Sequence, residues 1–233
     1  EPYWVLDGKK FKRTTIKYSP GLLKIFDEVL VNAIDRNSMY PKQVTSISVN
    51  VDKISGMITI DNNGPLGGLV IQKNKKEDVW NPELVFGHLL TSTNYDDTQK
   101  RLVGGRNGYG AKLANIYSKW FSVIIKDPET KQEYHQEWFD NMSTCYVPKI
   151  KKFNGATPSV SVSFKPDWSR FAMKDMENGI YNIMEKRVWD ANICTSANCK
   201  VKFNGEALPK QTFEAYAKMH YGVDDVYSAT TDR

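Results

Sequence analysis

The stretch Gly104-Gly-Arg-Asn-Gly-Tyr-Gly-Ala-Lys-Leu113 decides the fold more than any other part of this sequence. Four glycines and an asparagine fall within seven residues, and a helical pattern begins directly after them. Backbone N–H groups of such a segment can surround a phosphate, and Arg106 and Lys112 add positive charge on either side. We therefore predict a phosphate-binding lid in this stretch, with an ordinary glycine turn as the alternative.

Two common phosphate motifs do not fit this stretch. In a P-loop a lysine and then Ser or Thr would follow the second glycine, but Ala111 stands before Lys112 and Leu113 comes after it. In a dinucleotide-binding motif a third glycine would stand at Leu113, and no parallel strand–helix–strand unit surrounds the stretch. The predicted phosphate site is therefore of a different kind.

A helical pattern runs earlier in the chain, from Gly21 to Asp35. With a turn of about 100° per residue, six apolar side chains share one broad face: Leu22, Ile25, Phe26, Val29, Leu30 and Ala33. Glu28, Asn32 and Asp35 share a narrow stripe away from that face. A carboxylate that polarises water, one turn before an amide oxygen that can hold Mg²⁺, suits hydrolysis. A solvated polar face is the alternative.

Two polar turns could complete a nucleotide site. Asp61-Asn-Asn-Gly64 follows the predicted strand 58–60 directly, where a carboxylate or amide can accept a proton of a purine amino group. Thr91-Ser-Thr-Asn94 is a run of small hydrogen-bonding residues suited to sugar and phosphate oxygens. Both patterns also occur in ordinary loops, so each supports a nucleotide site only in combination with the others.

The remaining pattern predicts a mixed sheet with helices on one face. Strands are predicted at 45–51, 58–60, 121–125, 160–164 and 200–203, and the first two form a hairpin. Helices are predicted at 21–35, 82–90, 110–119, 175–193 and 209–220, with Asn81-Pro82 as the cap and first turn of the second. Interleaved helices and antiparallel strand pairs indicate the α+β class, with one domain over residues 1–233.

Composition agrees with a folded domain and excludes several classes of protein. The 233 residues include 32 Lys and Arg against 27 Asp and Glu, a net charge of +5 that is only a weak indication of nucleic-acid contact. No apolar run approaches the roughly 20 residues that span a bilayer, and the N-terminus lacks a signal-peptide pattern. Cys145, Cys194 and Cys199 lack partners for a zinc site, which favours structural thiols in a reducing compartment.

The order of these features resembles the GHKL ATPases, whose Bergerat fold binds ATP with a helical Glu-x-x-x-Asn, a strand-end Asn-x-Gly and a glycine-rich lid. Within that superfamily the sequence is most similar to the ATPase domains of eukaryotic-type type II DNA topoisomerases. Four segments carry the resemblance: PGLLKIFDEVLVNAID (20–35), LTSTNYDD (90–97), GGRNGYGAKLANIYS (104–118) and KVKFNGEALP (200–209). The resemblance covers almost the whole chain and implies a mostly antiparallel mixed sheet with helices on one face.

The resemblance also implies a role for each matching residue. Glu28 would be the general base for the attacking water, and Asn32 would coordinate Mg²⁺ beside the phosphates of ATP. Asn62 or Asn63 would meet the adenine. The contacts to ribose and phosphate would come from Ser92, Thr93 and Asn94. The lid over the triphosphate would consist of Gly105, Arg106, Asn107, Gly108, Tyr109, Gly110, Ala111 and Lys112.

The sequence departs from the family's pattern at two places. Where the family usually has Asn-Ala-Ala-Asp-Asn, this chain has Asn32-Ala-Ile-Asp-Arg36. Where it has Asn-Asn-Gly-x-Gly-Ile-Pro-Val, this chain has Asn62-Asn-Gly-Pro-Leu-Gly-Gly-Leu-Val70. The second difference moves a glycine, so the choice between Asn62 and Asn63 stays open. The divergent loops suggest an unusual source, such as a large DNA virus.

The resemblance implies an ATP-hydrolysing domain that dimerises on nucleotide binding and acts as a gate for DNA in the full-length isomerase. The family's transducer lysine and DNA-cleavage tyrosine have no match in these 233 residues, so we expect slow hydrolysis by this chain alone. A nuclear location is implied, or host cytoplasm or virion for a viral source, with neither secretion nor a membrane partner. The alternatives are another GHKL ATPase, of the chaperone or mismatch-repair type, and a non-hydrolytic nucleic-acid-binding module that uses Lys149 to Phe153.

Overall fold

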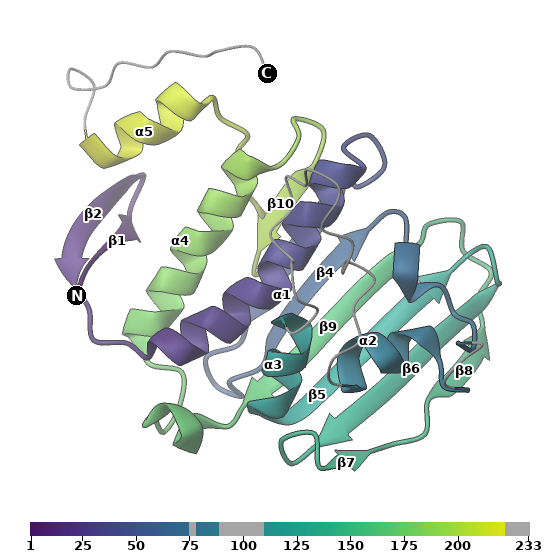
Figure 1. Ribbon diagram of the computed structural model, residues 1–233. Coiled ribbons are helices and arrows are strands. Elements are labelled where there is room, and N and C mark those ends of the chain that lie inside the picture. Colours follow the sequence, from purple (N-terminus) through teal and green to yellow (C-terminus); the bar gives the residue numbers. More distant parts are fainter. Residues whose placement is uncertain (75–77, 89–109, 222–233) are drawn as a thin grey trace, which may run out of the picture.

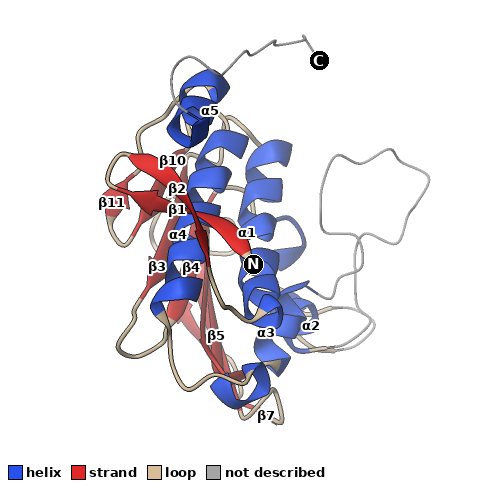
Figure 2. Ribbon diagram, turned by 90° about the vertical axis from the view of Figure 1, so that its left-hand side faces the viewer, coloured by secondary structure: helices blue, strands red, loops and turns tan. Residues whose placement is uncertain are grey.

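A computed structural model of the protein describes residues 1–74, 78–88 and 110–221 and has two layers, a sheet and the helices that cover one of its faces (Figures 1 and 2). Within these residues the main sheet has nine strands. In sheet order they are β11 (Glu206–Ala207), β10 (Lys200–Phe203), β3 (Ser46–Val51), β4 (Ile58–Asn63), β9 (Ser159–Pro166), β5 (Ser118–Asp127), β6 (Gln132–Phe139) and β7 (Thr144–Cys145), and β8 (Lys149–Lys152) pairs with β6. The predicted α+β class is confirmed, because every pairing except the parallel β10–β3 pair is antiparallel.

The central strands form because apolar and polar residues alternate along them. The hairpin predicted over residues 45–60 is the antiparallel pair of β3 and β4. Ile58 and Ile60 are buried under the helices, whereas Asp61 points to the opposite face. β4 continues past Ile60, its predicted end, to Asn63, because the last residues of the strand also pair with β9. Residues predicted to lie in a turn therefore belong to the sheet.

Six strands of the described residues have no counterpart among the predicted ones. They are β6, β7, β8 and β11 in the main sheet, together with the separate hairpin of β1 (Pro2–Asp7) and β2 (Lys10–Thr15). β6 shows why: its inward positions are Tyr134, Gln136 and Trp138, so a polar residue interrupts the apolar alternation. The hydroxyl of Tyr134 donates to the buried Gln136 side chain, which satisfies it. Such strands depend on hydrogen bonds to their neighbours more than on an apolar pattern.

The helices are α1 (Pro20–Met39), α2 (Asn81–Gly87), α3 (Gly110–Ile116), α4 (Asn178–Cys194) and α5 (Phe213–Tyr221), with 3₁₀ turns η1 (Gly67–Leu69) and η2 (Trp168–Phe171). All five predicted helices exist, although their ends differ. The predicted cap of α2 is wrong, because Trp80 occupies the cap position and Asn81 is already helical. In the described part of the chain, no helix is both long enough and apolar enough to cross a bilayer.

The helix predicted over residues 110–119 is shorter than expected. It ends at Ile116, and β5 begins at Ser118. The aromatic and β-branched run from Trp120 to Ile125 pairs with β6 on one side and β9 on the other. Hydrogen bonding on both sides favours the strand over a last helical turn.

The predicted apolar face of α1 is buried. Its side chains are at most 3% exposed, namely Leu22, Ile25, Phe26, Val29, Leu30 and Ala33. The helix packs against α3, α4 and β4 in the layer that covers the sheet (Figure 1). Burial of this face fixes the rotation of α1, so the stripe that holds Glu28 and Asn32 lies beside the core rather than within it.

A second apolar cluster joins the N-terminal hairpin to α4 and α5, and consists of Phe11, Trp189, Tyr216 and Met219. Lys186 of α4 is buried beside it, with its ammonium 4.8 Å from the centre of the Phe11 ring. The ammonium donates hydrogen bonds to Asp190 at 2.6 Å and to the Tyr216 hydroxyl at 2.7 Å. These partners offset the cost of burying the charge.

Arg187, the next residue on α4, connects this region to α1. It donates hydrogen bonds to Asp190 at 3.2 Å and to Asp27 at 2.9 Å. Asp27 directly precedes Glu28 in the chain. The charged residues of α4 therefore hold the helix that carries the predicted catalytic carboxylate.

We expect Arg187→Gln to lower the free energy of unfolding by about 1–3 kcal/mol, because two half-buried carboxylates lose their shared donor. Urea unfolding monitored by tryptophan fluorescence measures the change. Arg13→Gln, on the exposed side of β2, is the matched control and should change the stability little. Equal losses in the two variants would contradict a role for the Arg187 contacts.

The deficit of Arg187→Gln should also depend on pH. Burial raises the pKa of Asp27 above its usual 3.8, and Arg187 opposes this. Without Arg187 the native state binds the proton of Asp27 more tightly than the unfolded chain does, so acid favours the native state. The deficit should therefore be largest near neutral pH and shrink as pH falls toward about 4. A deficit that grows on acidification would contradict this.

Candidate functional site

Glu28, the predicted general base, lies in the middle of α1 at the margin of its buried face. Its side chain is 23% exposed and forms an ion pair with Lys24 at 2.5 Å, one turn earlier. Lys24 is 67% exposed, and an ion pair so open to water contributes only about 0–1 kcal/mol. The carboxylate is therefore oriented by Lys24 but can take another partner at small cost.

Gly110, the first residue of α3, lies directly against the Glu28 carboxylate. A Cβ atom added at Gly110 would collide with Oε2 of Glu28 and would stand 3.3 Å from its Cβ. Only a residue without a side chain fits there while the carboxylate keeps its position. The end of the glycine-rich stretch and the predicted general base are thus in contact, although they are far apart in the sequence.

The last three residues of the predicted lid form the first turn of α3. Ala111 is buried, and Lys112 is only 1% exposed. Burial lowers the pKa of Lys112, because the charged ammonium loses water. The lysine that the sequence places beside the phosphates therefore lies in the interior.

Eight predicted site residues lie outside the described residues: Ser92, Thr93, Asn94, Gly105, Arg106, Asn107, Gly108 and Tyr109. The described residues that flank them are His88, directly after α2, and Gly110, the first residue of α3. These two helices pack on each other over the sheet (Figure 1). The contacts predicted for these eight residues with ribose and phosphate stay predictions.

The register of β4 separates the two asparagines that could meet adenine. Asn62 follows Ile60 on the helix-covered face, whereas Asn63 belongs to the opposite face. Oδ1 of Asn63 accepts hydrogen bonds from the backbone N–H groups of Thr45 and Ser46, both at 2.9 Å, and its Nδ2 donates to Oγ1 of Thr45 at 2.8 Å. Asn63 therefore fastens the start of β3 to the end of β4, and Asn62 is the candidate on the helix side.

We expect these two asparagines to respond differently to alanine. Asn62→Ala should weaken nucleotide affinity roughly tenfold, because the predicted hydrogen bond to adenine is lost, while the free energy of unfolding stays nearly constant. Asn63→Ala should lower the free energy of unfolding by about 1 kcal/mol, since two backbone N–H groups lose their acceptor. Urea unfolding and titration with a fluorescent ATP analogue separate the two effects. The opposite pattern would assign the binding role to Asn63.

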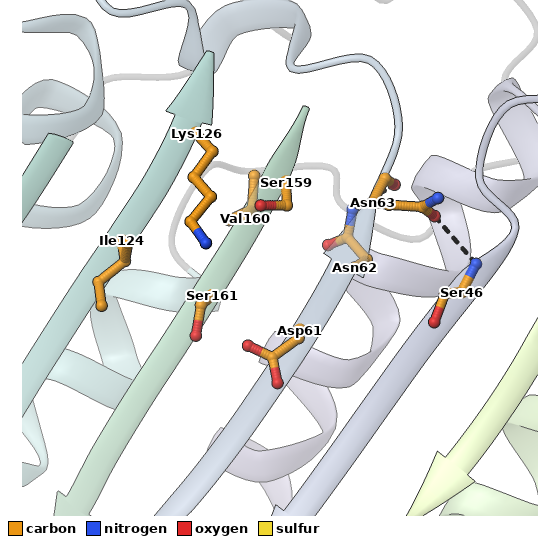
Figure 3. Close-up of a pocket in the computed structure, with 9 residues that line it drawn as sticks. All are labelled: Ser46, Asp61, Asn62, Asn63, Ile124, Lys126, Ser159, Val160 and Ser161. Carbon is orange, nitrogen blue, oxygen red and sulfur yellow. Dashed lines mark hydrogen bonds between the residues drawn. The ribbon is translucent and has the colours of Figure 1, made fainter. Parts of the chain in front are cut away.

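A shallow cavity of about 370 Å³ opens on the helix-free face of the sheet (Figure 3). Its lining comprises Ser46, Asp61, Asn62, Asn63, Ile124, Lys126, Ser159, Val160 and Ser161. Asn62 therefore also borders this cavity, although the alternation along β4 assigns its side chain to the helix-covered face. Burial raises the pKa of Asp61, an effect that the Ser161 hydroxyl and the Lys126 ammonium oppose. Since Asp61 points to this face, it lies across the sheet from Glu28 and does not share a site with it.

The described residues contain no group of three or more His, Cys, Asp or Glu side chains that could hold a metal ion. Mg²⁺ in nucleotide sites is usually bound by one or two protein oxygens, with water and phosphate as the other ligands. Asn32, exposed on α1 one turn after Glu28, offers one such oxygen. The donor set therefore fits a Mg²⁺ ion that arrives with phosphates, and does not fit a protein cage.

The sequence is similar to curated proteins named DNA topoisomerase 2. It is 42% identical to the protein of Penicillium chrysogenum over 92% of the chain, 43% identical to that of Saccharomyces cerevisiae over 86%, and 38% identical to that of Arabidopsis thaliana over 93%. The chain spans only 13% to 14% of the length of these relatives. No family model matches the chain.

The fold is similar to solved structures of one region of such enzymes. The ATPase region of Saccharomyces cerevisiae topoisomerase II gives a TM-score of 0.89 at 40% identity, over 94% of this chain and 57% of that chain. The ATPase and transducer domains of DNA topoisomerase II from Balamuthia mandrillaris give 0.88 at 39% identity, over 95% and 57%. Sequence and fold comparisons thus select the same region.

Proposed function

Since this chain belongs to the type II DNA topoisomerase family, as a homologue of its ATPase region, we propose that it binds and hydrolyses ATP to drive DNA passage by the full-length enzyme. Identity of 38% to 43% over most of the chain supports this function over a chaperone, a mismatch-repair protein or a non-hydrolytic nucleic-acid-binding module. One observation carries the proposal: Gly110, at the end of the glycine-rich stretch, lies against the Glu28 carboxylate. A phosphate-binding segment and a general base then meet at one place, as hydrolysis requires.

In the proposed reaction Glu28 accepts a hydrogen bond from a water molecule and aligns it with the γ-phosphorus of ATP. The water oxygen forms the new bond, the bond to the β-γ bridging oxygen breaks, and the water proton passes to the Glu28 carboxylate. Little covalent work falls to the protein, so most of the rate comes from position. Lys24 on one side and Gly110 on the other restrict where the carboxylate can lie.

Asn32 is the proposed Mg²⁺ ligand. Its exposed amide stands one turn beyond Glu28 on the same helix, so its oxygen can meet an ion carried by the phosphates. When bound, Mg²⁺ neutralises charge on the β- and γ-phosphates. Asn32 also lies outside the buried face of α1, so the ion and its waters need no space inside the core.

The rest of the nucleotide would be held by residues from three elements. Asn62, at the helix-side end of β4, is the proposed adenine contact. We assign Ser92, Thr93 and Asn94 to the ribose and phosphate. Because Lys112 is buried, the lid from Gly105 to Lys112 would hold the triphosphate through backbone N–H groups and the Arg106 side chain.

The activity of the full-length protein is proposed on the same basis. Residues 1–233 would form one nucleotide-binding domain, two copies of which would dimerise on binding ATP and close a gate for DNA. The name DNA topoisomerase 2 of the relatives, all three from eukaryotes, supports DNA as the substrate and the nucleus as the location. A viral source, with host cytoplasm or virion as location, stays a prediction.

Calorimetric titration with Mg²⁺ and a non-hydrolysable ATP analogue tests the nucleotide site. We expect saturable heat, and a stabilisation of about 2.7 kcal/mol when the free ligand reaches one hundred times its dissociation constant. Removing Mg²⁺ with a chelator should weaken binding. No heat and no shift in melting temperature, for folded protein, would contradict the proposal.

A further inference from the structure

Arg36 lies on α1 one turn beyond Asn32 and two turns beyond Glu28. Its guanidinium packs on the loop after β4: a Cβ atom added at Gly67 would stand 2.5 Å from Nη1 of Arg36. Gly67 has a φ of +57° in the turn that follows Asn62 and its neighbours. The arginine therefore reaches from α1 to η1, the 3₁₀ turn that follows the strand with the proposed adenine contact.

The charge of Arg36 is not neutralised by any carboxylate in residues 1–74, 78–88 and 110–221, whereas Arg187 pairs with Asp27 and Asp190. Its guanidinium carbon lies 6.0 Å from the centre of the Tyr40 ring. Burial lowers the pKa of Arg36, since water no longer fully solvates the cation. A ligand group that covers the plane of this half-buried guanidinium, or accepts its hydrogen bonds, would stabilise the cation.

Glu28 and Arg36 meet different parts of the site. Glu28 contacts Gly110, at the end of the lid, and Arg36 contacts Gly67, beyond the asparagine proposed for adenine. Eight residues of helix separate them by about 12 Å along the axis, a span that an extended nucleoside triphosphate can bridge. The phosphates belong at the Glu28 end, so the base belongs near Arg36.

We infer that Arg36 is a nucleotide-contacting residue whose guanidinium plane stacks on the purine base of the bound nucleotide. The inference rests on the proposed ATP site and adds a specificity residue to it. A planar cation over an aromatic ring is attracted by the ring's negative face, and arginine makes this contact better than lysine does.

The test compares how tightly each variant binds a complete nucleotide and how tightly it binds a chain of three phosphates without the base. Wild type, Arg36→Lys and Arg36→Met are titrated with the non-hydrolysable ATP analogue, and inorganic tripolyphosphate is then used as a competitor. Arg36→Lys keeps the charge but loses the plane, so affinity for the analogue should fall roughly threefold to tenfold, and further in Arg36→Met. The inhibition constant of tripolyphosphate should stay within about twofold of wild type in Arg36→Lys.

Two other results would contradict stacking of Arg36 on the base. An equal loss for the analogue and for tripolyphosphate would make Arg36 a phosphate contact, and no loss in either variant would remove it from the site. Arg13→Lys, an exposed arginine on β2, is the control and should bind like wild type. Melting temperatures identify any variant that is misfolded, and Arg36→Lys is the variant least disturbed in packing. Failure of the wild type to bind the analogue would overturn the proposed function and this inference together.

Discussion

Replacing Glu28 with glutamine is expected to lower ATP turnover by about 10²- to 10⁴-fold, because the amide cannot accept the proton of the attacking water. Nucleotide affinity should stay close to that of wild type, since glutamine has the same shape and the carboxylate is not a proposed ligand of ATP. The loss of the Lys24 ion pair should cost at most about 1 kcal/mol of stability, as Lys24 is mostly exposed.

Single-turnover assays with the protein in excess over ATP measure this effect even when hydrolysis is slow. Glu177→Gln makes the same chemical change on an exposed residue before α4 and should hydrolyse ATP like wild type. A Glu28→Gln variant with normal turnover would show that another group accepts the proton. A variant that no longer binds nucleotide would instead make Glu28 a binding residue.

Gly110→Ala should reduce turnover by about 10²-fold without unfolding the protein, because the added methyl group occupies the position of the Glu28 carboxylate. Two of the residues that follow, Ala111 and Ala114, are buried, so α3 cannot easily withdraw. The flexible Glu28 side chain would move instead, away from its proposed catalytic position. Alanine suits the helical backbone at Gly110 and is favoured over glycine by up to about 1 kcal/mol, so the melting temperature should hold or rise.

Gly21→Ala is the matched control, since it adds the same methyl group to the first turn of the helix that carries Glu28. There the new Cβ would lie 3.4 Å from the nearest atom of Phe171, which is an ordinary contact. Turnover of Gly21→Ala should equal that of wild type. If Gly110→Ala also kept full turnover, the position of the carboxylate against α3 would not matter for hydrolysis.

Much of the fold was predictable because its signals are local. The apolar face of α1 follows from a period of 3.6 residues, and the β3–β4 hairpin follows from alternation around a turn. β6 was not predictable in this way, because the buried Gln136 breaks its pattern. The end of α3 was predicted too late, since β5 begins at Ser118, which pairs with Pro166 of β9, and Lys119 lies at the register shift that follows. Elements that depend on distant partners carry weak local signals.

The candidate site also has a part that the sequence predicts and a part that it does not. Residue types and spacing alone predicted three parts of it: Glu28 and Asn32 on one stripe, a pair of asparagines at a strand end, and a glycine-rich segment for phosphate. Their chemistry is a property of the side chains and of nearest neighbours along the chain, so no tertiary contact was needed to predict it.

Only the tertiary structure decided which groups face one another. The register of β4 turned Asn62 to the helix side and used Asn63 to fasten β3, while packing buried Lys112, brought Gly110 onto Glu28 and set Arg36 against Gly67. A one-residue change in strand register exchanges the two faces of a strand, and the rotation of a helix depends on everything packed against it. Such choices result from many long-range contacts acting together, which no local stretch of sequence contains.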